Sequence, residues 1–215
     1  MKWINELYGK YKGDIYILGS GPSLAYLKQS FFDGKIVIGL NYVYKDWRCD
    51  YTLTHHHCMA QEAINDGTTL ITSEIGTCHP NNPPHNFQGE YYVYKHTLQG
   101  YSEVDLTQFP EKIGAAGTPV VAALQIAYLM GAKNIILVGV DGGQIDGQYN
   151  YKDYTIPTDT GHAGRVEKAI RETANMLREK GINVHSLNPF LNLTLEDHKF
   201  VSCNGLWNDP NLDKK

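Results

Sequence analysis

The sequence predicts an α/β fold, a three-layer sandwich built on a mainly parallel sheet. Short apolar runs rich in β-branched residues alternate along the chain with segments that have the apolar spacing of helices. The run at 134–140 is apolar at almost every position, as expected of a central parallel strand that is buried on both faces. The first apolar run, at 15–18, passes directly into a glycine-rich turn. We therefore expect a single domain over residues 1–215.

The individual elements are predicted in chain order. The apolar spacing at 2–12 predicts a short amphipathic helix, and the run at 15–18 predicts the first strand. A helix is expected over 23–32, ended by Gly34. β-branched and aromatic runs predict further strands at 35–40, 51–54, 69–72, 91–94, 134–140 and 182–185. Helical spacing predicts further helices at 59–65, 120–130 and 163–180. The helix at 120–130 has no charged residue, so it should be buried between layers.

The regular alternation breaks over about 73–117. Proline, glycine, tyrosine and glutamine are frequent there, and only 91–94 resembles a strand. A long stretch without regular structure inside a compact domain is usually a lid or a binding insertion. We therefore expect a lid-like insertion over these residues.

Composition excludes several classes of protein. The formal net charge of −4 and the pI of about 6.1 argue against general nucleic-acid binding. No apolar stretch is long enough to span a bilayer, and the first residues do not resemble a signal peptide. The four cysteines lie far apart without a Cys-x-x-Cys pair, as expected of reduced thiols. We expect a cytoplasmic protein; peripheral membrane association and a homo-oligomer stay open.

The glycine-rich turn after the first strand is the first candidate binding site. It consists of Gly19, Ser20, Gly21, Pro22 and Ser23. Glycine leaves backbone amides uncovered, and proline suits the first turn of a helix, so the segment could hold a phosphate. It lacks the third glycine of the dinucleotide fingerprint and the lysine of a P-loop. A plain tight turn is the alternative.

Further candidates lie where the predicted strands end, because ligands bind at the carboxyl edge of such sheets. Asn41 could contact a base or ribose, or could be a turn residue. Asp141 could orient a ribose, hold Mg²⁺ or cap the following turn. Gly117 and Thr118 begin the apolar helix, where they could bind a phosphate or form an ordinary N-cap. His55 could face the pocket.

His55 begins a run of three histidines that does not predict a metal site. Consecutive residues in an extended segment point to opposite faces, so at most two of the three could share a ligand. No acidic residue or cysteine stands at the spacing of a metal site. We therefore assign no metal ligand.

His162 is the best catalytic candidate, because it stands at the beginning of the helix predicted at 163–180. The positive helix end disfavours the imidazolium form, so the ring could accept a proton from an attacking hydroxyl. The alternative is a histidine that only caps the helix. Tyr149, Tyr151 and Tyr154 precede it, and their hydroxyls could hold a leaving phosphate or simply pack the loop.

Several of these segments together resemble a known family. The segment Ile17-Leu18-Gly19-Ser20-Gly21-Pro22-Ser23-Leu24 is similar to the glycine-proline-serine turn of the small bacterial sialyltransferases that use CMP-sialic acid. It equally resembles the related 6-hydroxymethylpterin pyrophosphokinase-like and flagellin-modifying proteins. The likeness continues through 40–42, 117–118, 131–141, 161–162 and 187–189, and it covers roughly 14–60 and 115–190.

The sialyltransferase resemblance implies a Rossmann-like fold, a nucleotide-sugar donor and no required metal. It implies that Gly19, Gly21, Asn41 and Thr118 contact the nucleotide, that His162 is the base and that Tyr149 holds the leaving phosphate. Three positions depart from that pattern: Ser20 and His55 stand where the family has asparagines, and Gly143 stands where it has a second tyrosine. The pyrophosphokinase-like branch instead implies a nucleoside triphosphate, Mg²⁺ and a pterin or other small acceptor.

The function predicted first is that of an inverting glycosyltransferase of the sialyltransferase-like type. It would transfer a sugar from a nucleotide-sugar donor, which could be CMP-linked, to a glycan acceptor in surface polysaccharide or lipopolysaccharide biosynthesis. A Mg²⁺-dependent pyrophosphokinase is the alternative, with Asp141 near the metal. A nucleotide-binding protein without turnover is the third hypothesis.

Overall fold

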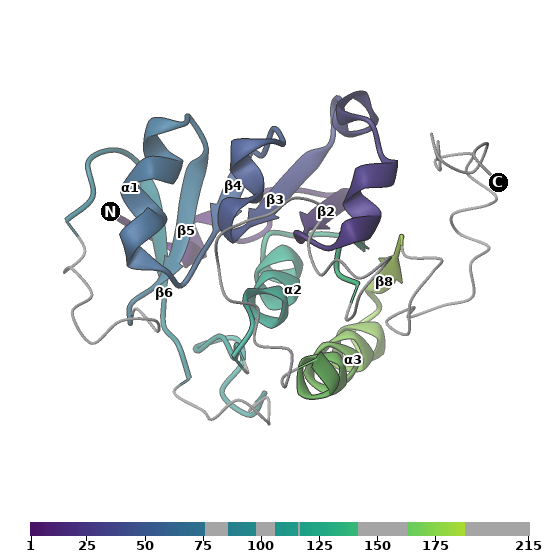
Figure 1. Cartoon of the computed structure of the whole chain (residues 1–215). Coiled ribbons are helices and arrows are strands. Elements are labelled where there is room, and N and C mark those ends of the chain that lie inside the picture. The colour runs from purple at the N-terminus through teal and green to yellow at the C-terminus, as the bar shows by residue number, and fades with distance from the viewer. Residues whose placement is uncertain (76–85, 98–105, 116, 142–162, 188–215) are drawn as a thin grey trace, which may run out of the picture.

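The computed structural model describes residues 1–75, 86–97, 106–115, 117–141 and 163–187 (Figure 1). Within them lies an eight-stranded sheet of order β1-β6-β5-β4-β3-β2-β7-β8, in which every neighbouring pair is parallel. Its strands are β1 (Lys2–Trp3), β2 (Asp14–Leu18), β3 (Ile36–Leu40), β4 (Tyr51–Leu53), β5 (Thr69–Ser73), β6 (Tyr91–Tyr94), β7 (Asn134–Val138) and β8 (Asn183–Ser186). The predicted α/β class and parallel sheet are confirmed.

The order of the strands reverses between β2 and β7. The chain moves outward from β2 through β3, β4, β5 and β6, and then returns to place β7 on the other side of β2. Leu18 at the end of β2 is in register with Val138 at the end of β7. In open α/β sheets, ligands bind outside the carboxyl ends of the strands at such a reversal. The turns that follow β2 and β7 therefore define where a site is expected.

Helices cover both faces of the sheet, as a three-layer sandwich requires (Figure 1). α2 (Pro119–Leu129) and α3 (Ala163–Glu179) pack on one face, and α1 (His57–Asn65) packs on the other. Alternate residues of a strand point to opposite faces, so Ile15 faces α2 whereas Tyr16 packs in the opposite layer. This alternation explains why the strands read as continuous apolar runs.

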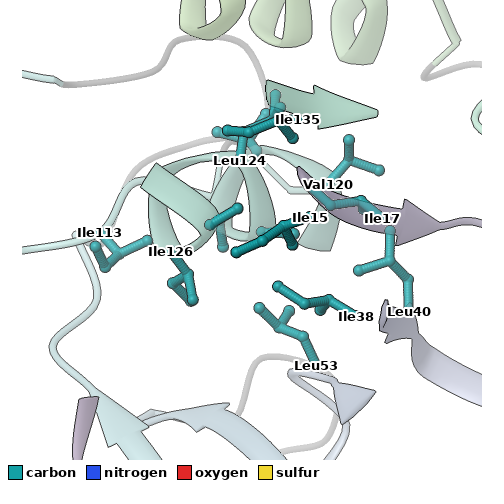
Figure 2. Close-up of a cluster of buried hydrophobic side chains, with 14 of the residues drawn as sticks. Ile15, Ile17, Ile38, Leu40, Leu53, Ile113, Val120, Leu124, Ile126 and Ile135 are labelled. Carbon is teal, nitrogen blue, oxygen red and sulfur yellow. The ribbon is translucent and has the colours of Figure 1, made fainter. Parts of the chain in front are cut away.

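α2 is the buried helix that the uncharged run at 120–130 predicts. Every residue from 120 to 127 is buried, including Gln125. The Gln125 side-chain amide donates to the Gly114 carbonyl (2.7 Å) and accepts from the Gly114 N–H (3.1 Å), so its polar atoms have partners inside the core. Figure 2 shows the apolar cluster where Val120, Leu124 and Ile126 meet the sheet residues.

Two of the predicted helices are wrong. Residues 2–12 form the short edge strand β1 and the 3-10 helix η1 (Ile4–Leu7), because Trp3 pairs with Val93 of β6. The helix expected over 23–32 is replaced by two 3-10 helices, η2 (Pro22–Tyr26) and η3 (Gln29–Phe32), with extended backbone at 27–28. Leu24, Leu27 and Phe32 are all buried in one apolar cluster, so these side chains reach the core without a continuous α-helix.

The strand predicted at 91–94 lies inside the sheet as β6. It pairs with β5 on one side and β1 on the other, and all four of its residues are buried. This part of the 73–117 segment is therefore core structure. Residues 76–85 and 98–105 lie outside the described residues, so the lid expected there stays a prediction. None of the helices described is both long and apolar enough to cross a bilayer.

Candidate functional site

The turns after β2 and β7 pack directly against each other at the strand-order reversal. The Gly19 N–H donates to the Val138 carbonyl (2.8 Å), and the Gly21 N–H donates to the Gly139 carbonyl (2.7 Å). A Cβ on Gly19 would lie 2.5 Å from the Gly139 carbonyl oxygen, which is too close for any side chain. Gly139 has a φ of +64°, a conformation that glycine adopts without strain. Gly19 and Gly139 must therefore be glycines, because the backbones of the two turns are in direct contact at these residues.

Asp141 holds the β2 turn in place. Its two carboxylate oxygens accept hydrogen bonds from the Ser23 amide (2.7 Å to Oδ2) and the Ser23 hydroxyl (to Oδ1). The Asp141 side chain is only 3% exposed. Burial raises the pKa of Asp141, and the two hydrogen bonds from Ser23 act in the opposite direction. We call this contact the Ser23–Asp141 brace.

The packing of the two turns corrects the expectation that the glycine-rich turn has uncovered amides. The amides of Gly19, Gly21 and Ser23 all donate to acceptors within the protein. The helix that follows, η2, is a five-residue 3-10 helix that begins at the buried Pro22. Three of the amides proposed to cradle a phosphate are therefore already used. Ser20, which is half-buried, lies between them at the surface of the turn.

Asn41 has an unusual backbone conformation at the end of β3. Its φ is +52°, and among the described residues other than glycine it alone has a positive φ. The Asn41 Oδ1 accepts a hydrogen bond from the Thr54 hydroxyl (3.0 Å), which in turn accepts from the His56 N–H (3.0 Å). The Thr72 hydroxyl donates to the Thr54 carbonyl (2.7 Å). The carboxyl ends of β3, β4 and β5 are thus joined in one polar network.

His55 lies at the end of β4 in a buried position. Its Nε2 shares a hydrogen bond with the hydroxyl of Tyr94, the last residue of β6. Burial, and then the neighbouring imidazoles of His96, His56 and His57, lower the pKa of His55 to about 3. His55 is therefore neutral at physiological pH and serves as a hydrogen-bonding group.

This burial predicts a pH dependence of folding. The pKa of His55 is about 3 in the folded protein and near 6.5 in an unfolded chain, so the unfolded state binds more protons between these values. Stability should therefore fall on acidification through this window, with His55 contributing at most about 1.4 kcal/mol per pH unit. Urea unfolding at pH 7.5, 6 and 5 measures the slope. The free energy of unfolding should change less with pH in His55→Gln than in the native chain. An equal slope would contradict the lowered pKa of His55.

Thr118 acts as the N-cap of α2. Its hydroxyl accepts a hydrogen bond from the Val120 N–H (3.4 Å), and its own N–H donates to the Ala115 carbonyl (2.8 Å). Gly117 precedes it with a φ of +73° and is exposed. The N-cap hypothesis for Thr118 is confirmed. Phosphate binding at this helix end stays a prediction.

The catalytic candidates lie outside the described residues. These are His162, Tyr149, Tyr151 and Tyr154, together with Gly143. The helix expected after His162 is confirmed as α3, which begins at Ala163. Among the residues that are described, no group of three or more histidine, cysteine, aspartate or glutamate side chains could hold a metal ion.

Sequence reasoning missed Thr54, Tyr94 and His96. Thr54 connects Asn41 to the ends of β4 and β5, and Tyr94 bonds His55. His96 follows β6 by two residues, and its ring lies 5.4 Å from that of His55, centroid to centroid. The signal available was a histidine shortly after the aromatic run at 91–94. It could have been used only with the knowledge that this run enters the same parallel sheet.

Comparisons with known proteins show what the fold is similar to. No family model and no curated protein matches the sequence. A MAf glycosyltransferase from Magnetospirillum magneticum AMB-1 aligns with a TM-score of 0.55 at 14% identity over 87% of this chain. The present chain spans only 35% of that protein.

The sialyltransferase CstII from Campylobacter jejuni, solved in complex with cytidine-5'-monophosphate, gives a TM-score of 0.51 at 16% identity, covering 93% of this chain and 86% of that one. The Campylobacter jejuni α-2,3-sialyltransferase Cst-I gives 0.52 at 16% identity, covering 85% and 78%. Identities this low show a shared fold. The Rossmann-like architecture found here is therefore the architecture of bacterial sialyltransferases and of a bacterial glycosyltransferase.

Proposed function

We propose that the chain is a glycosyltransferase that moves a sugar from a nucleotide-linked donor to a hydroxyl group of a glycan acceptor. Two observations support this. The fold is shared with enzymes of that class over most of the chain. The candidate site also lies at the strand-order reversal, where ligands bind in such sheets. A CstII sialyltransferase of this fold was solved with CMP and a trisaccharide acceptor.

The observation that carries the proposal most directly is the conformation of Asn41. A left-handed backbone is uncommon at residues other than glycine, asparagine adopts it more readily than most, and such conformations gather at ligand sites. Here the Thr54 hydroxyl, directly after β4, fixes the Asn41 side chain at the carboxyl edge of the sheet, and β3 itself pairs with β2. A carboxamide offers both a donor and an acceptor, which suits a base or a ribose. We assign the nucleotide to the ends of β2 and β3.

The reaction we propose inverts the sugar configuration. His162 takes the proton of the acceptor hydroxyl as its oxygen bonds to the anomeric carbon, while the bond from that carbon to the donor phosphate oxygen breaks. Tyr149 and Tyr154 hold the departing phosphate. These roles rest on the sequence, as does the assignment to surface polysaccharide or lipopolysaccharide assembly. Ser20, Gly117 and Thr118 complete the proposed donor contacts, and no metal is required.

The pyrophosphokinase hypothesis placed Asp141 near Mg²⁺. Asp141 is buried, both of its oxygens accept hydrogen bonds from Ser23, and its role near Mg²⁺ stays a prediction. A carboxylate that is used in this way links two turns of the protein. We therefore retain the glycosyltransferase as the proposal. In the test below, nucleotide binding that requires Mg²⁺ would contradict it.

A substitution that keeps the backbone of Asn41 tests the nucleotide site. Glycine adopts a positive φ without strain, so Asn41→Gly removes only the carboxamide. We expect CMP, UDP or GDP to bind the native chain without Mg²⁺ in isothermal titration calorimetry, and Asn41→Gly to weaken that binding at least about tenfold, the worth of a lost hydrogen bond.

The matched control is Asn65→Gly, at the exposed end of α1, which should leave the nucleotide affinity unchanged. Equal affinity in native and Asn41→Gly chains would remove Asn41 from the site. Binding of ATP with Mg²⁺, and of no nucleotide without it, would favour the kinase over the transferase.

A further inference from the structure

Three rings meet at the carboxyl ends of β4 and β6, to one side of the proposed nucleotide site. They belong to His55, Tyr94 and His96, and we call them the ring cluster. The centroids of His55 and Tyr94 are 6.1 Å apart, those of His55 and His96 are 5.4 Å apart, and those of Tyr94 and His96 are 6.3 Å apart. Tyr94 is fully buried, and its hydroxyl is bonded to His55. No role has been assigned to His96 so far.

The backbone holds His96 firmly from both sides. Its N–H lies 3.4 Å from the Glu74 Oε1, to which it donates at the end of β5. The residues on either side of His96 both bond to the backbone of Ile113. The Ile113 N–H donates to the Lys95 carbonyl (2.9 Å), and the Thr97 N–H donates to the Ile113 carbonyl (3.1 Å). His96 is therefore a fixed part of the sheet edge, unlike a histidine on a mobile surface loop.

The imidazole of His96 is buried without a hydrogen-bond partner. The residue is 9% exposed, and neither Nδ1 nor Nε2 has a partner among the residues that the structure describes. Buried polar atoms are nearly always paired, because an unpaired one has lost its hydration without compensation. Among the described residues this is an exception at the ligand-binding edge of a sheet, where a bound ligand can supply the missing partner.

The surroundings of His96 decide which chemistry that partner has. Burial lowers the pKa of His96, and the nearby Glu74 carboxylate opposes this less strongly, so the ring is neutral. A neutral imidazole presents one N–H donor and one nitrogen acceptor, which a hydroxyl group matches, because a hydroxyl both donates and accepts. An ionised carboxylate has no proton to donate, and a carboxylate or a phosphate would place a second negative charge near Glu74.

We propose that His96 binds a hydroxyl group of an uncharged sugar, on the acceptor side of the site. This inference rests on the proposed function for the class of substrate. β6 lies three strand positions from β3, or roughly 14 Å at the usual spacing, so the sugar would lie beside the nucleotide along one edge. The ring nitrogens are buried, so binding requires a local side-chain shift, which is common at binding surfaces.

Imidazole NMR tests this proposal without turnover. In a chain labelled with ¹⁵N-histidine, the His96 signals are assigned by their loss in His96→Phe. We expect neutral glycosides (methyl β-galactoside, methyl α-glucoside or lactose) to shift these signals, and the affinity to fall at least about tenfold in His96→Phe. His96→Gln, which keeps a donor and an acceptor, should retain part of that affinity. CMP affinity should stay within about twofold, because the nucleotide lies at β2 and β3.

Three results would overturn the inference. These are unshifted His96 signals at saturating glycoside, equal glycoside affinity in His96→Phe, or a response only to glucuronate or inorganic phosphate. The proposed function fails separately: if no nucleotide binds but a neutral glycoside shifts His96, the transferase proposal is wrong while the sugar site stands.

Thermal unfolding gives an independent readout. His96→Phe removes a buried unpaired group, so its Tm should equal or exceed that of the native chain. His55→Phe is the matched comparison, and its Tm should fall because Tyr94 loses its hydrogen-bond partner. A Tm of His96→Phe below that of His55→Phe would show that the His96 nitrogens are paired within the chain, which contradicts the premise.

Discussion

Gly21→Val should destabilise the protein by about 3–5 kcal/mol, the combined scale of overpacking a core and leaving a buried polar group unpaired. A Cβ on Gly21 would lie 2.5 Å from the Asp141 Oδ2 and 2.6 Å from the Gly139 carbonyl oxygen. One of these neighbours is backbone, and the other is the carboxylate that holds Ser23, so neither can move without breaking a hydrogen bond. Chemical denaturation followed by circular dichroism measures the loss.

Gly13→Val is the control for this change. Nothing lies within 4 Å of a Cβ built on Gly13, which is exposed just before β2. Its stability should stay within about 0.5 kcal/mol of the native value, as surface substitutions usually do. If Gly21→Val matched this control in stability but lost nucleotide binding, the glycine would be needed for the ligand, and the packing explanation would be wrong.

His162→Ala should lower turnover by roughly 10²–10⁴-fold, the usual contribution of a general base. The affinity for the donor should hardly change, because the base acts on the acceptor hydroxyl. Turnover of the native enzyme should fall on the acid side as His162 gains a proton. These quantities are measured with a confirmed donor and acceptor, by product formation over a range of pH.

A second histidine, His96, separates the effects on binding from the effects on catalysis. His96→Phe should raise the KM for the acceptor, with a smaller effect on kcat, whereas His162→Ala should lower kcat. The α3 helicity should survive in His162→Ala, since alanine is a good helix former. A native-like rate for His162→Ala would refute the mechanism proposed here.

The strands of the sheet were predictable because of how a parallel sheet is buried. Strands covered on both faces must be apolar wherever they are buried, as β2, β3 and β7 are after their first residue, and such runs stand out in a sequence. The segment at 23–32 was not predictable in the same way. Its apolar residues are frequent enough for a helix, but Phe32 packs against Tyr16 and Trp47, which lie outside the segment.

The candidate site was predictable in place but not in detail. Gly21, Asn41 and Asp141 do lie at the carboxyl edge of the sheet, where the strand pattern placed them. A glycine that admits a phosphate and a glycine that admits another backbone look identical in sequence, so the contact with Gly139 could not be foreseen. His96 was missed because no local sequence pattern predicts the order of the strands, and it is this order that places β6 in the sheet.

The Ser23–Asp141 brace also bears on when the site can exist during folding. Its two residues are 118 positions apart, so closing this contact requires the ordering of a long intervening loop. β2 pairs with β3, which follows it closely in the sequence, but its other neighbour, β7, begins only at Asn134. A nascent chain that has emerged as far as β6 can pair six of the eight strands and still lack the second turn of the site. Assembly of the nucleotide end therefore marks a late, non-local stage of folding, after the local pairs between β2 and β6 have become available.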